Sequence, residues 1–285
     1  MSKLYIVATP IGNLKDISKR ALETLTNCDF IIAEDTRHTL KLLSHYNIQK
    51  KLFSYHEHNE QEKSEEVIKR MVENDIGVAL VTDAGTPCIS DPGYIVVKKA
   101  RDMGIEIIGI SGPSAVITAL SVSGFQINTF AFYGFLPREQ GARKKIYEYL
   151  KYSEEELFVL YESPKRIIKL LKELSEEFIN SKVAVCSDLT KLHERTIVGE
   201  ITEVLKLFEN DEKAELGEYV VIIQKEKQEK VQEVLSNEAM IIDYIVKNKG
   251  ATIKTAVTEI TKSGISKKDL FNAGINLKET LHLYA

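Results

Sequence analysis

Hydrophobic and polar positions over the first 115 residues alternate between short apolar runs and longer amphipathic stretches. Short runs bounded by turn-forming residues predict β-strands, and stretches with apolar residues every three or four positions predict helices. The predicted strands are 3–8, 29–34, 51–54, 77–82 and 105–110, and the predicted helices are 17–26, 37–45, 60–74, 93–103 and 114–123. This alternation predicts a mostly parallel sheet with helices on both faces.

The pattern changes after Gly124, where aromatic-rich strands begin at Phe130. Further strands are predicted at 157–161, 182–187, 194–199 and 218–224, with helices at 138–151, 164–178 and 200–209. Two of these strands, on either side of Leu189 to Glu194, have no helix between them, which favours a mixed sheet. We therefore expect an α/β domain at 1–123, a mixed α/β domain at 124–226, and a linker with a helical appendage at 227–285.

The appendage contains three short helical patterns, at 237–248, 252–262 and 266–273, with Thr252 and Ser266 as expected N-caps. A charged, Glu/Lys-rich connector at 225–232 precedes them. Apolar positions recur at helical spacing and predict a small core that leaves the lysines outside; these positions are Ile253, Val257, Ile260, Ile265 and Leu270.

The appendage contains a basic stretch from Lys247 to Lys268. This stretch has six lysines, and Glu259 is its one acidic residue. Such a stretch is typical of RNA binding, with Lys254 and Lys267 as candidate contacts. The alternative is a solubilising tail that packs on the second domain.

Composition narrows the classes of protein. The chain has 285 residues, of which 44% are hydrophobic and 28% charged. Its net charge of -4 gives no global attraction to nucleic acid, so any RNA contact needs local basic patches. Its three cysteines lack metal-site spacing and predict reduced thiols. The apolar run Leu4–Ala8 is too short for a signal peptide, and no stretch reaches membrane-spanning length. We expect a soluble, cytoplasmic protein.

Four predicted strands end in small, polar or proline-rich turns. The most informative is Asp83-Ala84-Gly85-Thr86-Pro87, where a glycine allows close approach of backbone and an acid offers an acceptor. The others are Thr9 to Asn13, Ser111 to Ala115 and Glu162 to Arg166. Carboxyl ends of parallel strands are where open α/β sheets bind ligands, so these turns predict one compact ligand site. Any one turn alone could be a helix cap.

The stretch Glu34-Asp35-Thr36-Arg37 follows another strand and has two interpretations. Asp35 or Glu34 could accept a proton from a substrate hydroxyl, and Arg37 could bind a phosphate. Alternatively, Asp35 or Thr36 caps the next helix and Arg37 pairs with an acid.

The stretch from Tyr55 to Asn59 contains two histidines around an acid, but their spacing does not match a helical zinc site. We expect no metal there, and instead a hydrogen-bonding loop or a helix start at Asn59. A basic segment follows the first strand of the second domain, and a basic pair starts a later helix. These candidate phosphate contacts, or solvated surface residues, are Arg138, Arg143, Lys144, Lys165 and Arg166.

The chain carries no G-x-G-x-x-G, P-loop or G-x-S-x-G motif. Its blocks resemble, in order and over nearly the whole chain, the tetrapyrrole methylase superfamily, and most closely the branch that 2'-O-methylates cytidine in small-subunit ribosomal RNA. The blocks are 8–14, 33–37, 56–60, 83–87, 111–115, 134–138 and 161–166. The first loop lacks the glycines common in the superfamily, as expected of the RNA branch.

The resemblance implies two α/β domains with a cleft for S-adenosylmethionine between them, plus the helical appendage. It implies that the cofactor is bound by Pro10, Ile11, Asp83, Ala84, Gly85, Thr86, Ser111, Ser114, Ala115, Tyr161, Glu162 and Ser163. It further implies small-subunit rRNA as partner and a homodimer. Two alternatives remain open at this point: a methyltransferase of tetrapyrrole synthesis, and a ribosome-assembly factor that binds RNA without catalysis.

Overall fold

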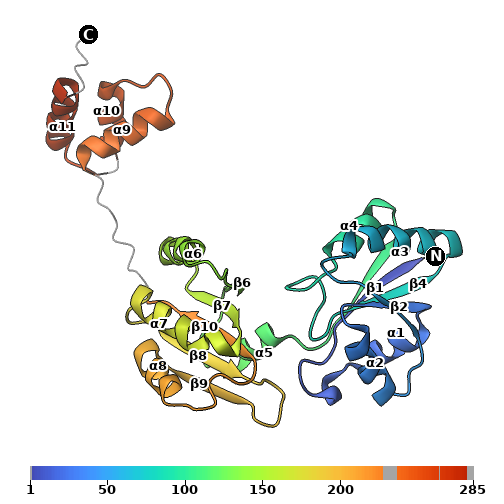
Figure 1. Cartoon of the computed structure of the whole chain (residues 1–285). Coiled ribbons are helices and arrows are strands. Elements are labelled where there is room, and N and C mark those ends of the chain that lie inside the picture. The colour runs from blue at the N-terminus through green and yellow to red at the C-terminus, as the bar shows by residue number, and fades with distance from the viewer. Residues whose placement is uncertain (1, 227–235, 263, 281–285) are drawn as a thin grey trace. The chain divides into compact units, whose positions relative to one another are not determined.

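The computed structural model describes residues 2–226, 236–262 and 264–280. Residues 1–226 form one compact unit and 227–285 a second (Figure 1). The charged connector expected at 225–232 lies, from residue 227 onward, outside the described residues.

The first sheet has the strand order β3-β2-β4-β1-β5, and all its strand pairs are parallel. Its strands are β1 (Lys3–Val7), β2 (Phe30–Ala33), β3 (Lys51–Ser54), β4 (Gly77–Val81) and β5 (Glu106–Ile110). The helices between them are α1 (Lys19–Asn27), α2 (Thr36–His45), α3 (Glu60–Asn74) and α4 (Tyr94–Asp102), with a 3-10 turn η1 (Leu14–Asp16) before α1.

Strand order and the right-handed crossover rule together decide which face each helix covers. The chain steps in one direction along the sheet from β1 to β3 and in the opposite direction from β3 to β5, so α1 and α2 must cover one face and α3 and α4 the other. Figure 1 shows this arrangement, and the core confirms it. Leu25 and Leu43 pack in one apolar cluster, whereas Met71 and Val96 pack in another.

The second sheet has the order β6-β7-β10-β8-β9 and is mixed, since β6 and β7 are parallel and the remaining pairs are antiparallel. Its strands are β6 (Ala131–Phe135), β7 (Leu157–Glu162), β8 (Lys182–Ser187), β9 (Arg195–Glu200) and β10 (Tyr219–Gln224). The accompanying helices are α6 (Gln140–Tyr152), η2 (Pro164–Arg166), α7 (Ile167–Glu177) and α8 (Ile201–Glu209).

Both faces of the second sheet are buried, as the period-two alternation of β10 shows. Val221 and Ile223 pack against α6, α7 and α8, while Val220 and Ile222 pack against α5 (Ala115–Val122). Helix α5 thus follows the first sheet in the chain but covers the second, which ties the two halves of residues 1–226 together.

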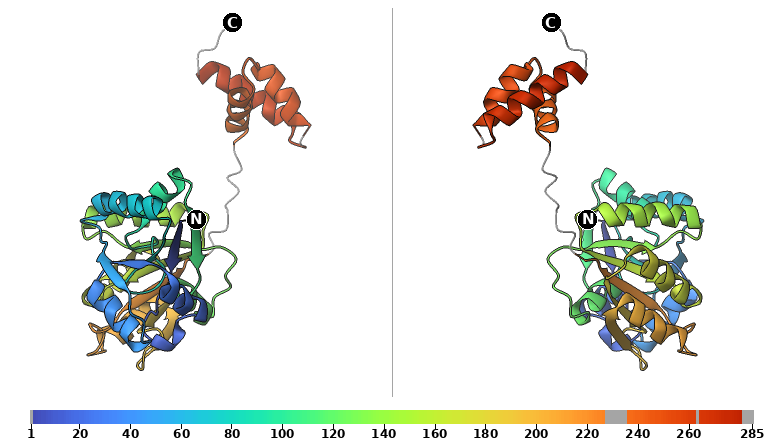
Figure 2. Two further views of the ribbon diagram at one scale, coloured as in Figure 1. Left: turned by 90° about the vertical axis from the view of Figure 1, so that its right-hand side faces the viewer. Right: turned by 90° about the vertical axis from the view of Figure 1, so that its left-hand side faces the viewer.

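The second unit is a three-helix bundle of α9 (Asn237–Lys247), α10 (Ile253–Thr261) and α11 (Lys267–Thr280), seen from two sides in Figure 2. Thr252 caps α10 by accepting from the Thr255 N–H, and the expected apolar residues form its core. Helix α11 runs beyond its expected end at 273. Gly274 lies inside this helix. A Cβ there would lie 3.0 Å from Ile253 of α10, so the glycine allows the two helices to pack closely.

Candidate active site

The predicted cofactor turns of the first sheet lie together because β4, β1 and β5 are adjacent and parallel. Thr9 and Gly85 join the first two turns by a pair of backbone hydrogen bonds of 2.9 and 3.1 Å. The third turn packs equally closely, since a Cβ at Gly112 would lie 3.0 Å from the Cβ of Ala8. The chain leaves β1 toward the α1 face and β4 toward the α4 face, so a binding crevice is expected above this pair of strands.

Gly85 is the residue that this arrangement requires to be glycine. Its φ of +81° lies in the left-handed region, and a Cβ would be 3.6 Å from Ile11 and 4.0 Å from the Pro113 carbonyl. Ala84 beside it is exposed and Thr86 is half-buried. The exposed residue of the loop is therefore Ala84, whereas Gly85 is buried and its backbone is paired with Thr9.

The other predicted cofactor residues of the first half divide into core and loop. Pro10 and Ile11 are buried, and Ile11 packs with Val116 and with strands of the second sheet. Ser114 caps α5 by accepting from the Ile117 N–H at 3.4 Å, whereas Ser111 is exposed and Ala115 half-buried.

Three carboxyl groups gather at the ends of β2 and β4. The Thr82 hydroxyl donates to Glu34 at 2.6 Å, and Asp83 accepts from the Asp35 N–H at 3.2 Å. Burial raises the pKa of Asp83, with the Glu34 charge as the second cause. Burial and the same charge raise the pKa of Asp91 to about 6, against a smaller opposing effect of the Thr82 hydroxyl. Such a cluster suits a cation and can hold a proton near neutral pH.

Asp91 is a residue that sequence reasoning missed, since it lies in the turn just before the predicted helix 93–103. The aspartate of a turn before a helix usually caps that helix. Here Gly93 occupies the cap position of α4, and the Asp91 side chain is left half-buried near the other acids. Local sequence gave no signal for this, because the raised pKa depends on burial and on Glu34 from another strand.

Asp35 is the predicted base that the structure corrects. Its carboxylate caps α2, accepting from the Arg37 N–H at 2.8 Å, and binds the Arg37 guanidinium at 2.7 and 3.1 Å. These bonds hold the pKa of Asp35 well below its ordinary value. The capping interpretation is therefore the right one for Asp35, which is a weak proton acceptor. Arg37 stays exposed despite this pair.

The second half contributes Tyr161 to the same site. Burial raises the pKa of Tyr161 to about 12, and the second cause is the charge of Asp91 from the first half. The Val116 backbone at the start of α5 has a smaller opposing effect on this pKa. Asn13 N–H donates to Thr190 Oγ1 at 3.1 Å, which fixes the first loop to the second sheet. The structure thus brings the fourth predicted turn to the other three.

Glu162 and Arg166, which follow Tyr161 in the chain, form an ion pair with each other. Glu162 is 5% exposed and binds Arg166 at 2.6 Å, and it also accepts from the N–H and hydroxyl of Ser163. A side chain paired in this way holds the turn in place. The side chains of Glu162 and Arg166 therefore support the turn, and do not by themselves offer groups to cofactor or RNA.

Arg143 is likewise a correction to the predicted RNA contacts. It is 5% exposed and binds Glu173 through two nitrogens at 2.7 and 2.9 Å, while a third donates to the Pro137 and Arg138 carbonyls. A buried, fully paired guanidinium anchors α6 on α7 and is not available to phosphate. Of this group, the residues that remain exposed are Arg138, Lys144 and Lys165.

Lys254 and Lys267 of the second unit are exposed on its surface, as predicted. The Tyr55 to Asn59 segment forms a hydrogen-bonded loop, in which the Asn59 side chain accepts from the His56 N–H at 2.9 Å. Among the residues that the structure describes, no group of three His, Cys, Asp or Glu is arranged to hold a metal ion. No helix within the described ranges is both long and apolar enough to cross a membrane.

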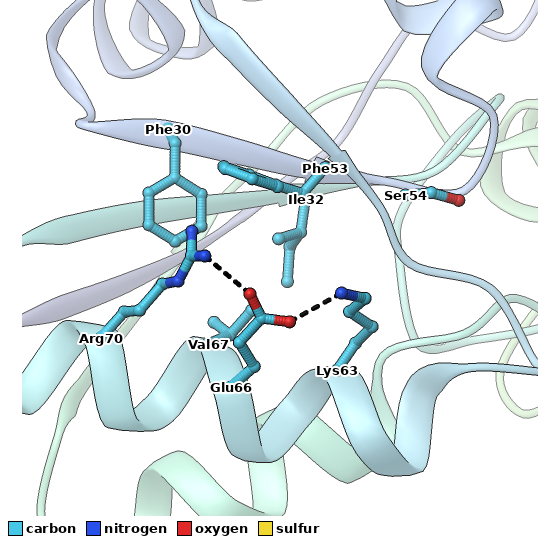
Figure 3. Close-up of a pocket in the computed structure, with 8 residues that line it drawn as sticks. All are labelled: Phe30, Ile32, Phe53, Ser54, Lys63, Glu66, Val67 and Arg70. Carbon is cyan, nitrogen blue, oxygen red and sulfur yellow. Dashed lines mark hydrogen bonds and ion pairs between the residues drawn. The ribbon is translucent and has the colours of Figure 1, made fainter.

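A surface pocket lies away from these loops, between α3 and the strands β2 and β3 (Figure 3). Its polar side chains satisfy one another, since Glu66 pairs with Lys63 at 2.6 Å and with Arg70 at 2.7 Å. Arg70 also lies over the Phe53 ring at 5.0 Å. We therefore assign no ligand to this pocket.

Comparison with known proteins places the chain in a family. The model of the tetrapyrrole (corrin/porphyrin) methylases matches residues 3–205, and the chain belongs to this family, whose members use S-adenosylmethionine. Similar proteins named ribosomal RNA small subunit methyltransferase I occur in Vibrio cholerae serotype O1, 40% identical with 95% of both chains covered, and in Bacillus subtilis, 38% identical with 96% of this chain and 94% of the relative covered.

Solved structures show the same fold at low identity. Diphthine synthase matches with a TM-score of 0.57 at 14% identity, covering 79% of this chain and 90% of the other. Uroporphyrin-III-C-methyltransferase from Thermus thermophilus matches with a TM-score of 0.53 at 17% identity, covering 78% and 94%. These matches support the two-sheet α/β architecture predicted from the sequence.

Proposed function

We propose that this protein transfers a methyl group from S-adenosylmethionine to the ribose 2'-hydroxyl of a decoding-centre cytidine in small-subunit (16S) ribosomal RNA. The relatives named as ribosomal RNA small subunit methyltransferases support the substrate class. The observation that carries the proposal is the meeting of the turns at one place: Thr9 pairs with Gly85, Gly112 packs on Ala8, and Ser90, next to Asp91, packs on Gly134 of the second half.

The residues present fit the cofactor. The left-handed Gly85 turns the loop so that the small residue Ala84 is exposed, and Asp83 adds a carboxylate at the end of β4. The negative charge of Glu34, Asp83 and Asp91 complements a ligand that carries a sulfonium and an ammonium group. When bound, S-adenosylmethionine supplies an electrophilic methyl group. We assign its binding to the four turns, through Asp83, the backbone of 84–86, the Ser111 to Ala115 turn and Tyr161.

We assign Asp91 as the general base that accepts the proton of the attacking hydroxyl. A general base works best when its pKa lies near the operating pH, and the Asp91 pKa of about 6 meets this condition while the depressed pKa of Asp35 does not. Glu34 then acts beside it, holding Thr82 and adding negative charge. Asp91 would take the hydroxyl proton as the methyl group moves to the oxygen, and the sulfur of the cofactor would leave as a neutral thioether with the electron pair of the broken carbon–sulfur bond.

The exposed cations provide the RNA contacts in this proposal, and they are Arg37, Arg138, Lys144, Lys165, Lys254 and Lys267. Their charges are local, as an acidic protein requires. A cytoplasmic location and a homodimer belong to the same proposal.

The test is a methyl-transfer assay with radiolabelled S-adenosylmethionine. Small ribosomal subunits that lack the modification, naked 16S rRNA and uroporphyrinogen III are offered in parallel. Label in RNA, released as 2'-O-methylcytidine on digestion, is the expected result. Label in uroporphyrinogen alone would show a tetrapyrrole methyltransferase. Cofactor binding measured by calorimetry, without label in any substrate, would refute the proposed RNA substrate while leaving the cofactor site intact.

A further inference from the structure

An exposed aromatic side chain lies beside the proposed active site without a role in it. Phe135, at the end of β6, is 57% exposed. Its ring centroid lies 5.5 Å from that of Tyr161, which also contacts Phe132 at 4.9 Å. Phe135 thus contacts Tyr161 at an interplanar angle of 57° while most of the residue is open to solvent.

A backbone irregularity brings these rings together. Phe132 and Phe135 are three residues apart, and in a regular strand such residues point to opposite faces. The pairing of β6 with β7 shifts between Phe132 and Gly134, so Phe135 lies opposite Tyr161 in the register. Gly134 has a φ of +60°, in the left-handed region that favours glycine. The irregular strand therefore aims Phe135 at Tyr161, as bulges beside active sites do.

This aromatic cluster adjoins the proton acceptor. The Asp91 charge acts on Tyr161, and a Cβ at Gly134 would lie 3.3 Å from the hydroxyl of Ser90, the residue before Asp91. Arg138 and Lys165, both exposed, follow β6 and β7 within a few residues. An open aromatic face, a proton acceptor and two cations are the groups that a single unstacked nucleotide needs for its base, ribose and phosphate.

We propose that Phe135, supported by Tyr161, is the platform on which the target base stacks while its ribose meets Asp91. This inference rests on the proposed function and names the part of the RNA that the site holds. A 2'-hydroxyl inside a folded RNA is reached by drawing the nucleotide out of its stack, and an aromatic ring replaces the lost stacking.

The test compares Phe135→Ala, Phe135→Leu and Phe135→Trp with wild type in methylation of small subunits that lack the modification. Tyr152→Ala is the matched control, because Tyr152 is an 82% exposed aromatic residue on α6 without an assigned role. We expect the Ala and Leu variants to lose about 5-fold to 150-fold in kcat/KM, the change produced by about 1–3 kcal/mol of stacking per base. The Trp variant and the control should behave as wild type, and cofactor affinity should be unchanged in all four.

Each outcome decides the inference. A wild-type kcat/KM in the Ala variant would overturn it, because the ring would then be dispensable. A wild-type kcat/KM in the Leu variant would also overturn it, because an apolar contact without a ring would then suffice. Weakened cofactor binding in the Ala variant would assign Phe135 to the cofactor and overturn it as well. If wild type binds cofactor but leaves small subunits and rRNA unlabelled, the proposed function itself fails, and this inference fails with it.

Discussion

Replacing Asp91 by Asn tests the electrostatics of the site through stability as well as activity. Burial and the Glu34 charge raise the Asp91 pKa from 3.8 to about 6. The folded protein therefore holds this proton more tightly than the unfolded chain, and ionisation of Asp91 costs folding free energy. That cost is absent below the unfolded pKa, grows between about pH 4 and pH 6, and is complete above pH 6. Asn carries no charge and avoids it.

The magnitude follows from the size of the change in pKa. For a fully desolvated group the rise would cost about 3 kcal/mol. Asp91 is only half-buried, and solvent screening reduces the cost to about 1–2 kcal/mol. We expect the Asp91→Asn variant to be more stable than wild type by this amount at pH 7.5 and to lose most of this advantage at pH 4.5, since the cost disappears fully only below the unfolded pKa of 3.8.

Urea unfolding at pH 4.5, 6.0 and 7.5 measures the effect. Asp35→Asn is the control with the opposite sign, because Arg37 lowers the Asp35 pKa and the wild-type charge there stabilises the fold above the ordinary pKa. Equal differences between the Asp91→Asn variant and wild type at pH 4.5 and 7.5 would refute the reasoning. In the methylation assay the same variant should lose about 100-fold or more in rate, and the wild-type rate should fall as pH drops below 6.

Three further predictions concern other parts of the chain. Gly85→Val should abolish cofactor binding in calorimetry while the protein stays folded, since the branched side chain would strain a φ of +81° and press on Ile11 and Pro113 of the neighbouring turns, which displaces the loop assigned to the cofactor. Arg143→Ala should lower the free energy of unfolding by about 3 kcal/mol in urea titrations, because it leaves Glu173 without its buried partner. The double change Lys254→Ala with Lys267→Ala should flatten the salt dependence of binding to small subunits by about 0.7–0.9 log units per lost phosphate contact.

Matched controls separate these effects from general damage. Gly104→Val introduces a side chain at a comparable φ of +69° with no atom within 4 Å, and should leave cofactor binding intact. Lys262→Ala removes a lysine already paired with Glu259 at 2.7 Å, and should leave the salt slope unchanged. Cofactor binding by the Gly85→Val variant, unchanged stability after Arg143→Ala, or an unaltered slope for the double lysine variant would each contradict its prediction.

Local sequence predicted the elements well because each strand and helix has its own period and its own end signals. The structure confirms β3 at Lys51–Ser54, α3 at Glu60–Asn74 and β8 at Lys182–Ser187 with the expected bounds. Where each element packs is a different matter. Helix α5 follows the first sheet in the chain but covers the second, because its partners lie in β7, β8 and β10.

The candidate site was predicted in outline for the same reason. The turns after parallel strands are local features, and the sheet order brings them together. Whether a charged side chain is paired or free depends on partners far away in the sequence. Arg143 pairs with Glu173, 30 residues away, and burial together with the Glu34 charge raises the pKa of Asp91. Charge counts along the sequence cannot reveal these pairs, so the sequence leaves Arg143 as a candidate phosphate contact or surface residue, and Asp35 as a candidate base or helix cap.

The place of β10 in the second sheet bears on how the chain folds as it is synthesised. The last strand in sequence is the central one, flanked by β7 and β8. The first sheet has all its strands once Ile110 has emerged, whereas the second must wait for Tyr219–Gln224, roughly ten seconds later at about 5–20 residues per second. Once β7 and β8 have been synthesised, their apolar edges lack their shared partner until β10 emerges, so a nascent chain stalled between residues 187 and 219 is an aggregation-prone species. Completion of the proposed active site, to which we assign Tyr161 of that sheet, is therefore deferred almost to the end of the compact unit.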